Sequence, residues 1–273
     1  MHILFLLDYY TPHLGGIETV FSHIVRELNE KKIFVTVITS RYDQSLPAYE
    51  YHKNNPYLNI IRVGSWRIWY NLKAWRTAIR YAKACRQGWN NFSPITHIHC
   101  STYWSALLGW FVHCWTRLPV ILTVHEIYDK LRYDYFSRPK AVIHHLYEKL
   151  IFTASYTTYI SVSLYTYNSI RLAYGIPDQK HHMIANTVDP FWYKEEWKNG
   201  GMRDWEIDET IIFLYYGHCG VSKGIDMIIA LLPEIIRHPQ MRIVLNLTPS
   251  KRTDMIVSQI YALIDTREWS IDR

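Results

Sequence analysis

HILFLLDYYTPHLGGIETVFSHIVRELNEKKIFVTVITS, residues 2–40, holds two apolar runs of strand length with a segment of helical period between them. We predict strands at Ile3–Leu7 and Ile33–Thr39 and a helix at Gly16–Glu30. Continuous apolar strands joined by a helix are typical of a parallel sheet that is covered by helices on both faces. This stretch therefore predicts a doubly wound α/β fold.

The same alternation continues along the rest of the chain. Further strands are predicted at Asn59–Val63, Thr96–Cys100, Val120–Val124, Tyr156–Ser161, His182–Ala185, Ile211–Tyr216 and Arg242–Leu247. Further helices are predicted at Asn71–Gln87, Tyr103–Thr116, Ala141–Thr153, Leu164–Tyr174, Ser222–Arg237 and Thr253–Thr266. Because helices separate most of the strands, we expect parallel sheets.

Residues 191–209 interrupt this alternation with charged residues and a Gly-Gly pair. We place a linker there, between a first Rossmann-like domain at residues 1–190 and a second at residues 210–273. The second domain holds only about two strands and two helices, a size that buries little apolar area by itself. We therefore expect a nearly complete first domain and an incomplete second one.

The composition is that of a folded protein with one large or two ordinary cores: 273 residues, 49% hydrophobic and 20% charged. The net charge of +6 is spread along the chain without an RNA or DNA motif, so we do not expect nucleic acid as a partner. Four cysteines without CxxC spacing predict buried free thiols. No apolar run reaches the length of a membrane span, so we expect a cytoplasmic protein, and peripheral contact with the inner face of the cell membrane stays open.

Gly15 and Gly16 lie in the loop between the first strand and the first helix. Such a loop brings free backbone N–H groups and the positive helix end to one point, where a phosphate can bind. Glycines allow a ligand to come close because they carry no Cβ atom. The spacing is not G-x-G-x-x-G, so a dinucleotide site is not predicted, and an ordinary turn remains the alternative.

Five segments, in order along the chain, resemble the retaining glycosyltransferases of the GT-B fold, of the family 4 or group 1 type. They are PHLGGIETVFSHIVRELNEKKIFVTVITS, ITHIHCSTYWSALLG, ILTVHEIY, YISVSLYTYNSIRLAYGIPDQKHHMIANTVD and FLYYGHCGVSKGIDMIIALLPEI. The resemblance implies an α/β, GT-B-like fold of two Rossmann-like domains with parallel sheets, the first on the acceptor side and the second on the nucleotide-sugar side. It also implies transfer of a sugar from a UDP- or GDP-linked donor to a glycan, glycolipid or lipid-linked acceptor, with retention of configuration and without a metal or other cofactor.

The resemblance assigns roles to particular residues. His125 follows a predicted strand and is expected to be catalytic, in contact with the transferred sugar. Lys223 matches the family's lysine that neutralises the donor diphosphate, and Gly224 adds backbone donors at the start of a helix. His218 stands where the family has an arginine, and an imidazole is only partly charged near neutral pH. This position therefore departs from the family in its charge.

The remaining candidates are assigned to the cleft. Gly15 and Gly16 are expected to form its first-domain wall, opposite Lys223, where they approach the diphosphate or the transferred sugar. Further candidates for the cleft or the acceptor side are His13, Glu18, Glu126 and Asn186. Glu126 is interpreted as a structural hydrogen-bonding partner, and no covalent nucleophile is named.

Departures from the family pattern favour a second interpretation. Thr187 replaces a glycine, His218 replaces the arginine, and no two glutamates have the E-x7-E spacing with which the family binds its donor. The chain is therefore also consistent with a truncated or non-catalytic subunit. Such a subunit binds ligand without turnover or needs a partner chain that completes the second domain.

Residues 66–89 combine an apolar and a basic stripe on one predicted helix. The apolar stripe contains Ile68, Leu72, Trp75, Ile79 and Ala82, and the basic one contains Lys73, Arg76, Arg80 and Lys83. A basic flank beside a Trp-rich apolar face suits a helix that lies on an anionic membrane surface. A helix that covers a parallel sheet needs the same apolar stripe, so both interpretations stand.

Overall fold

The computed structural model describes residues 1–51, 55–64, 72–87, 93–129, 132–187, 211–217, 219, 223–238, 240–247 and 251–263. The chain divides into two compact units, Met1–Phe191 and Trp192–Arg273. Each unit is described by itself below.

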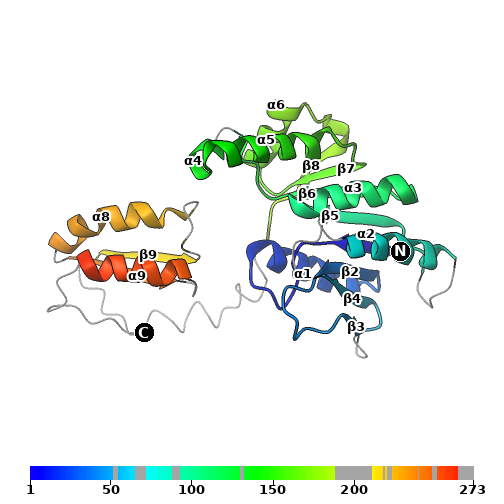
Figure 1. Cartoon of the computed structure of the whole chain (residues 1–273), viewed down its shortest axis with the longest axis horizontal. Helices are drawn as coiled ribbons and strands as arrows, with labels where there is room; N and C mark the ends of the chain where they lie inside the picture. The colour runs from blue at the N-terminus through cyan, green and yellow to red at the C-terminus, as the bar shows by residue number, and fades with distance from the viewer. Residues whose placement is uncertain are drawn as a thin grey trace. The chain divides into compact units, whose positions relative to one another are not determined.

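The larger unit is built on an eight-stranded sheet with the order β3-β4-β2-β1-β5-β6-β7-β8 (Figure 1). Its strands are β1 (His2–Leu6), β2 (Phe34–Ser40), β3 (Tyr49–Tyr51), β4 (Leu58–Val63), β5 (His97–Ser101), β6 (Val120–Val124), β7 (Thr158–Ser161) and β8 (His181–Met183). Neighbouring strands pair in parallel, except that β3 runs antiparallel to β4 at one edge. The predicted parallel α/β sheet is therefore confirmed, with an antiparallel edge strand that its short polar sequence does not reveal.

The helices of the larger unit are α1 (Gly16–Glu30), α2 (Leu72–Arg86), α3 (Trp104–Thr116), α4 (Arg132–Tyr135), α5 (Arg138–Thr153) and α6 (Leu164–Tyr174), with a short 3-10 helix η3 (Asp178–Lys180). Both α1 and α6 have the bounds predicted from the sequence. The four residues of α4 are too few to show a helical period, so the sequence does not predict this helix. Helix α5 begins before the predicted Ala141 because Pro139 is well suited to a first helical turn.

Alternating side chains of the sheet divide its core into two layers. Phe5 and Leu7 pack with Phe21 and Val25 of α1 in one cluster. Leu4 and Leu6 belong to a second, larger cluster that also contains buried residues of α2, α3 and α5. Because successive residues of a strand point to opposite faces, the apolar run of β1 serves both layers. The central strands are therefore buried on both sides, as the sequence predicts.

The smaller unit contains a parallel pair of strands, β9 (Ile211–Gly217) and β10 (Met241–Leu247), with helices α8 (Ile225–Arg237) and α9 (Lys251–Leu263) (Figure 1). Its described core consists of Tyr215, Cys219, Ile225, Leu232, Ile256 and Ile260. All four elements lie close to the predicted positions.

The cysteines are free thiols, as predicted, but their burial differs. Cys85, Cys100 and Cys219 are buried, whereas Cys114 is exposed, so the prediction of burial is wrong for this residue. Cys114 lies on α3 between the buried residues Val112 and Thr116, on the face of the helix that is turned away from the core.

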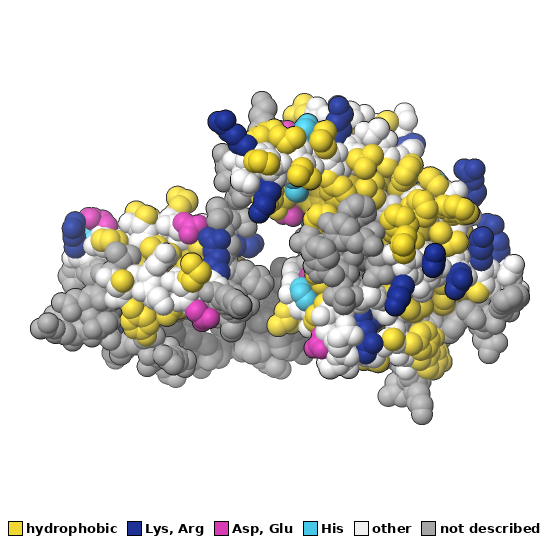
Figure 2. Space-filling view, viewed as in Figure 1, with side chains coloured by type: hydrophobic (Ala, Val, Ile, Leu, Met, Phe, Trp, Pro, Cys, Tyr) yellow, Lys and Arg dark blue, Asp and Glu magenta, His cyan; other side chains and the backbone are white. Residues whose placement is uncertain are grey.

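The surface of the larger unit carries exposed apolar side chains. Ile143, Leu146 and Leu150 are more than half exposed and form one stripe on α5. Figure 2 shows a broad apolar area on this unit, with Lys and Arg side chains at its margin. Among the described residues, none of the helices has the length and apolar character needed to cross a membrane.

Candidate active site

The candidate residues of the larger unit gather where the strands end at their carboxyl edge. β1 leads into the loop that carries His13 and Gly15, and β6 leads directly into His125. The carboxyl ends of parallel strands meet at one edge of a sheet, which is where ligands of α/β proteins bind. The connection from β1 to α1 and the residues after β6 therefore belong to the same region of the unit.

The start of α1 is occupied by a side chain of the protein itself. Gly15 precedes the helix in extended conformation, and its carbonyl accepts hydrogen bonds from the backbone N–H and the hydroxyl of Thr19. A Cβ atom on Gly15 would collide with the carboxylate of Glu18, which folds back over this position. Gly15 thus makes room for Glu18, a role that the sequence did not suggest. A carboxylate is favourable there because the helix N-terminus is positive.

Gly16 differs from its neighbour in its surroundings. It is exposed, and a Cβ atom at this position would meet nothing within 4 Å among the described residues. The approach to the backbone at Gly16 is therefore open. Of the two glycines, Gly16 is the one that keeps the space expected for a ligand.

His13 and Glu18 form a pair at this loop. His13 Nδ1 lies 3.0 Å from Glu18 Oε1, and Glu18 is only 8% exposed. The ring of His13 stacks on Tyr9 at 4.3 Å and meets Tyr42 edge-on at 5.0 Å. Two cleft candidates are thus brought together, with two tyrosines that the sequence interpretation did not include.

His125 is held at the end of β6 with one ring nitrogen unused. Its backbone N–H donates to Thr102 Oγ1 at 3.2 Å, and its ring meets Phe21 of α1 edge-on at 5.7 Å. Its Nε2 is buried and has no hydrogen-bond partner among the described residues. Burial lowers the pKa of His125 to about 4, so the imidazole is neutral near neutral pH. A neutral ring with a buried, unused nitrogen is ready to hydrogen-bond a ligand.

His99 also contacts Phe21 and was not among the predicted site residues. Its ring meets Phe21 edge-on at 5.5 Å and stacks on Phe5 at 4.9 Å, and its Nε2 lies 2.7 Å from Thr123 Oγ1. Burial, followed by the charge of His125, lowers the pKa of His99 to about 3. The signal was present in the sequence as a histidine within a predicted strand, in the segment ITHIHCSTYWSALLG that resembles the family.

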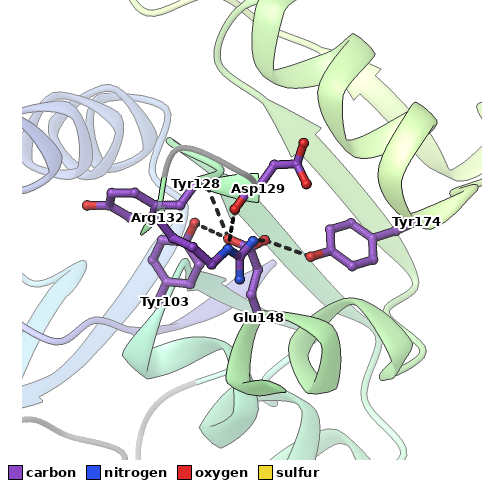
Figure 3. A network of polar contacts seen from close by, with 6 residues as sticks. All are labelled: Tyr103, Tyr128, Asp129, Arg132, Glu148 and Tyr174. Carbon is purple, nitrogen blue, oxygen red and sulfur yellow. Dashed lines mark hydrogen bonds and ion pairs between the residues drawn. The ribbon is translucent and has the colours of Figure 1, made fainter. Parts of the chain in front are cut away.

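The loop after His125 is anchored by the buried carboxylate of Glu148, another residue that the sequence interpretation missed (Figure 3). Tyr103 and Tyr174 donate to it from their hydroxyls at 2.7 and 2.6 Å, and the N–H of Tyr128 donates at 3.2 Å. Arg132 Nη2 completes the set at 2.5 Å. Burial by itself would raise the pKa of Glu148, but these hydrogen bonds outweigh it and hold the pKa below its usual value.

Glu126 and Asn186 lie at the surface of the larger unit. Glu126 is exposed and accepts a hydrogen bond from the hydroxyl of Tyr128 at 3.3 Å. Asn186 is exposed in the segment after β8. The assignment of Asn186 to the cleft stays a prediction.

The diphosphate candidates belong to the smaller unit. Gly224 precedes α8 with a φ of +72°, a left-handed conformation that favours glycine, and Lys223 beside it is exposed. His218 lies outside the described residues. Because each unit is described by itself, the expected position of Lys223 opposite Gly15 and Gly16 stays a prediction.

A metal site is not found in the described part of the chain. No three or more of its His, Cys, Asp and Glu side chains are grouped so as to hold an ion. The expectation of a metal-independent reaction stays a prediction.

Helix α2 clarifies the two interpretations of residues 66–89, of which 66–71 and 88–89 lie outside the described residues. Three residues of the apolar stripe are used for packing, because Trp75 and Ile79 contact the larger core cluster and Ala82 is buried within it, whereas Leu72 is 60% exposed. Lys73, Arg76 and Arg80 face a surface pocket instead. The helix thus covers the sheet, and membrane contact stays a prediction.

Comparisons with known proteins place this architecture among the GT-B glycosyltransferases. Sucrose-phosphate synthase from Thermosynechococcus elongatus has a TM-score of 0.65 at 16% identity, over 95% of this chain and 68% of that chain. Anabaena HepE in complex with UDP and glucose has a TM-score of 0.62 at 14% identity, over 96% and 66%. The lipopolysaccharide outer core galactosyltransferase WaaB in its apo form has a TM-score of 0.54 at 13% identity, over 96% and 65%.

These similarities concern the fold, because the identities are low. The chain spans about two thirds of the length of these solved chains. No curated protein matches it significantly. The predicted GT-B-like fold is confirmed by the solved structures. The sequence itself matches a family model over residues 14–191, which covers most of the chain, so this protein belongs to Glycosyltransferase Family 4.

Proposed function

We propose that this protein transfers a sugar from a nucleotide-sugar donor to a glycan, glycolipid or lipid-linked acceptor, with retention of configuration. Family membership and the GT-B fold support a glycosyltransferase. The observation that carries the proposal for the larger unit is His125, whose buried Nε2 has no partner among the described residues at the carboxyl edge of the sheet. A neutral imidazole there can accept or donate a hydrogen bond to a sugar hydroxyl without adding a charge.

The donor diphosphate is assigned to the smaller unit. Lys223 supplies a positive charge, and the backbone N–H groups at the start of α8 add hydrogen-bond donors for the leaving diphosphate. His218 strengthens this set when it is protonated. These groups make a reaction without a metal feasible, because they stabilise the negative charge that accumulates on the leaving diphosphate.

The binding step is tested with UDP, because the HepE structure contains UDP and glucose. We expect UDP or another common nucleoside diphosphate to raise the Tm of the chain, and Lys223→Ala to abolish the rise. Lys180→Ala, an exposed lysine of the larger unit, serves as the matched control and should leave the rise intact. A chain that shows no rise with any common nucleoside diphosphate would contradict the proposal.

The chemical step is tested with UDP-glucose and His125. We expect His125→Ala to keep the UDP-induced rise in Tm while donor turnover falls by roughly 100-fold or more, since a hydrogen bond to the reacting sugar is lost. The anomeric configuration of the product, measured by NMR, tests retention. Unchanged turnover in the variant would show that His125 takes no part in the reaction.

A second candidate function is ligand binding without turnover, in a subunit that acts with a partner chain. The histidine at position 218 favours it, because an imidazole stabilises a diphosphate less well than an arginine. The same experiment separates the candidates. Donor turnover by the purified chain excludes this one, whereas a rise in Tm without turnover supports it.

A further inference from the structure

A polar pocket lies in the larger unit, at the carboxyl ends of β2 and β4. Its volume is about 580 Å³. The cations that line it come from three elements: Arg41 after β2, Arg62 of β4, and Lys73, Arg76 and Arg80 of α2. No Asp or Glu is among its described lining residues. The pocket is therefore a concentration of positive charge, which attracts an anionic group.

Secondary structure brings these cations together. β2 and β4 are parallel neighbours, and the N–H of Arg41 donates to the carbonyl of Gly64 at 2.9 Å, so the ends of the two strands are joined. On α2 the lining residues are Lys73, Arg76, Thr77 and Arg80, which follow one another at the spacing of a single helix face. Three cations of the sequence's basic stripe are thus presented to one pocket.

The opposite side of α2 fixes this orientation. Ala74, Ala78, Ala82 and Cys85 are buried against the sheet, with exposed fractions of 4% or less. Rotation of the helix would expose these residues, so the basic face stays directed away from the core. The helix face that carries these cations is therefore directed toward the pocket before any ligand arrives.

Arg41 and Arg62 are also held in place. Arg41 donates from Nε to the carbonyl of Leu46 at 2.7 Å and from Nη2 to the carbonyl of Gln44 at 2.6 Å. Arg62 is 4% exposed, and its Nη1 pairs with Glu50 at 2.5 Å. Glu50 offsets the charge of Arg62 but does not line this pocket. For Arg76 and Arg80, the structure records no ion pair with a described carboxylate.

The pocket is connected to the candidate active site. Arg62 Nη2 donates to the carbonyl of Thr11 at 2.9 Å, in the same loop that carries His13 and Gly15. An anion bound among these cations would lie in the larger unit, at the carboxyl ends of β2 and β4, and Arg62 links that place to the loop. Guanidinium groups match phosphate oxygens in geometry and charge, and several of them suit a group with more than one negative charge.

We propose that this pocket binds a phosphate or diphosphate group, and that this group belongs to the acceptor. The second half of this inference rests on the proposed function, whereas the binding of phosphate does not. Two sources share the chemistry, a soluble phosphorylated sugar and the headgroup of a phosphorylated lipid.

Inorganic pyrophosphate is the probe, titrated calorimetrically into the full chain with UDP present in excess so that any diphosphate site around Lys223 is filled. We expect Arg76→Gln with Arg80→Gln to weaken pyrophosphate binding by at least about tenfold. Lys83→Gln with Arg86→Gln is the matched control, because it removes the same charge from α2 at positions that do not line the pocket. Circular dichroism and the Tm confirm that both double variants are folded.

Vesicles distinguish the two sources. The pocket is assigned to a lipid headgroup if the chain binds vesicles that contain phosphatidylglycerol but not vesicles of phosphatidylcholine alone. This binding must be lost in the Arg76 and Arg80 variant and kept in the Lys83 and Arg86 variant. Pyrophosphate binding that depends on Arg76 and Arg80, without vesicle binding, assigns it to a soluble phosphorylated acceptor. Equal effects of the two double variants, or no binding of either probe, would overturn the proposal.

The same titrations keep this inference separate from the proposed function. Loss of pyrophosphate binding in the Arg76 and Arg80 variant, in a chain that neither binds nucleoside diphosphates nor turns over a donor, supports the pocket and contradicts the proposed function. If the chain turns over a donor but its affinity for pyrophosphate is unchanged in the Arg76 and Arg80 variant, the proposed function is supported and the pocket proposal is contradicted.

Discussion

His99 and His125 both meet the ring of Phe21 edge-on, and burial keeps both imidazoles neutral near neutral pH. A neutral histidine offers one N–H donor and one acceptor nitrogen. His99 uses its Nε2 with Thr123, whereas Nε2 of His125 has no partner among the described residues. The two residues therefore differ in function: His99 supports the packing of the site, and His125 is left for a ligand.

The neutral state of His99 predicts a loss of stability in acid. Its pKa in the folded protein, about 3, is below the 6.5 of an unperturbed histidine, so the unfolded chain takes up the proton first as the pH falls. Stability from this group is complete above pH 6.5 and decreases toward pH 3, by at most about 1.4 kcal/mol per pH unit. His125 adds a loss of the same sign between 6.5 and about 4.

We expect His99→Gln to flatten this pH dependence, measured by urea unfolding near pH 7 and near pH 5. The exposed His182, changed to Gln, is the control and should leave the slope unchanged. An identical slope in wild type and His99→Gln would show that His99 is not the group that titrates.

At the scale of elements, the carboxylate of Glu148 connects α5 to the loop after β6. We expect Glu148→Gln to lower the free energy of unfolding by roughly 3–5 kcal/mol, because it leaves the buried charge of Arg132 without its partner. Tyr174→Phe removes one hydrogen bond to the same carboxylate and should cost less, about 1–3 kcal/mol. Urea unfolding measures both.

Glu27→Gln supplies the control, since Glu27 is an exposed glutamate of the same unit. Its effect should stay within about 0.5 kcal/mol. Equal effects of Glu148→Gln and Glu27→Gln would contradict a structural role for the buried network.

Helix α3 packs closely on β5 at Gly109. A Cβ atom there would lie 2.5 Å from Cys100 Sγ and 2.9 Å from its Cβ. We expect Gly109→Ala to destabilise the protein by roughly 1–3 kcal/mol, because a buried side chain or the helix has to move. Gly16→Ala, which would meet nothing within 4 Å, should leave the Tm nearly unchanged. A neutral Gly109→Ala would show that the contact between α3 and β5 is loose.

At the scale of the whole molecule, the two units differ in the size of their cores. The larger unit has an eight-stranded sheet and two core clusters, whereas the described core of the smaller unit is a single cluster. We expect a fragment of residues 1–191 to fold alone, with a cooperative thermal transition whose Tm lies within roughly 5 °C of the main transition of the chain. Circular dichroism tests this. A fragment without a cooperative transition would show that the larger unit depends on the smaller one.

The order of strands and helices could be predicted from the sequence, since it depends on local periods. The bounds of α1, α6 and β6 agree with the apolar pattern of their own residues. The strand β3 and the helix α4 could not be predicted, because three and four residues are too few to show a period. His125 was found through the resemblance of ILTVHEIY to a family motif, directly after an apolar strand.

The tertiary structure alone decided which side chains meet. Tyr103 and Glu148 are 45 residues apart, and Arg41 and Arg80 reach one pocket from different elements. At Gly15 the sequence predicted space for a ligand, but the side chain of Glu18 fills it. A side chain that folds back on its own helix leaves no periodic signal, so this contact could not be predicted. Local patterns determine where strands and helices begin and end. Contacts between distant segments follow from how those elements pack, and they decide which polar groups become partners and which remain for a ligand.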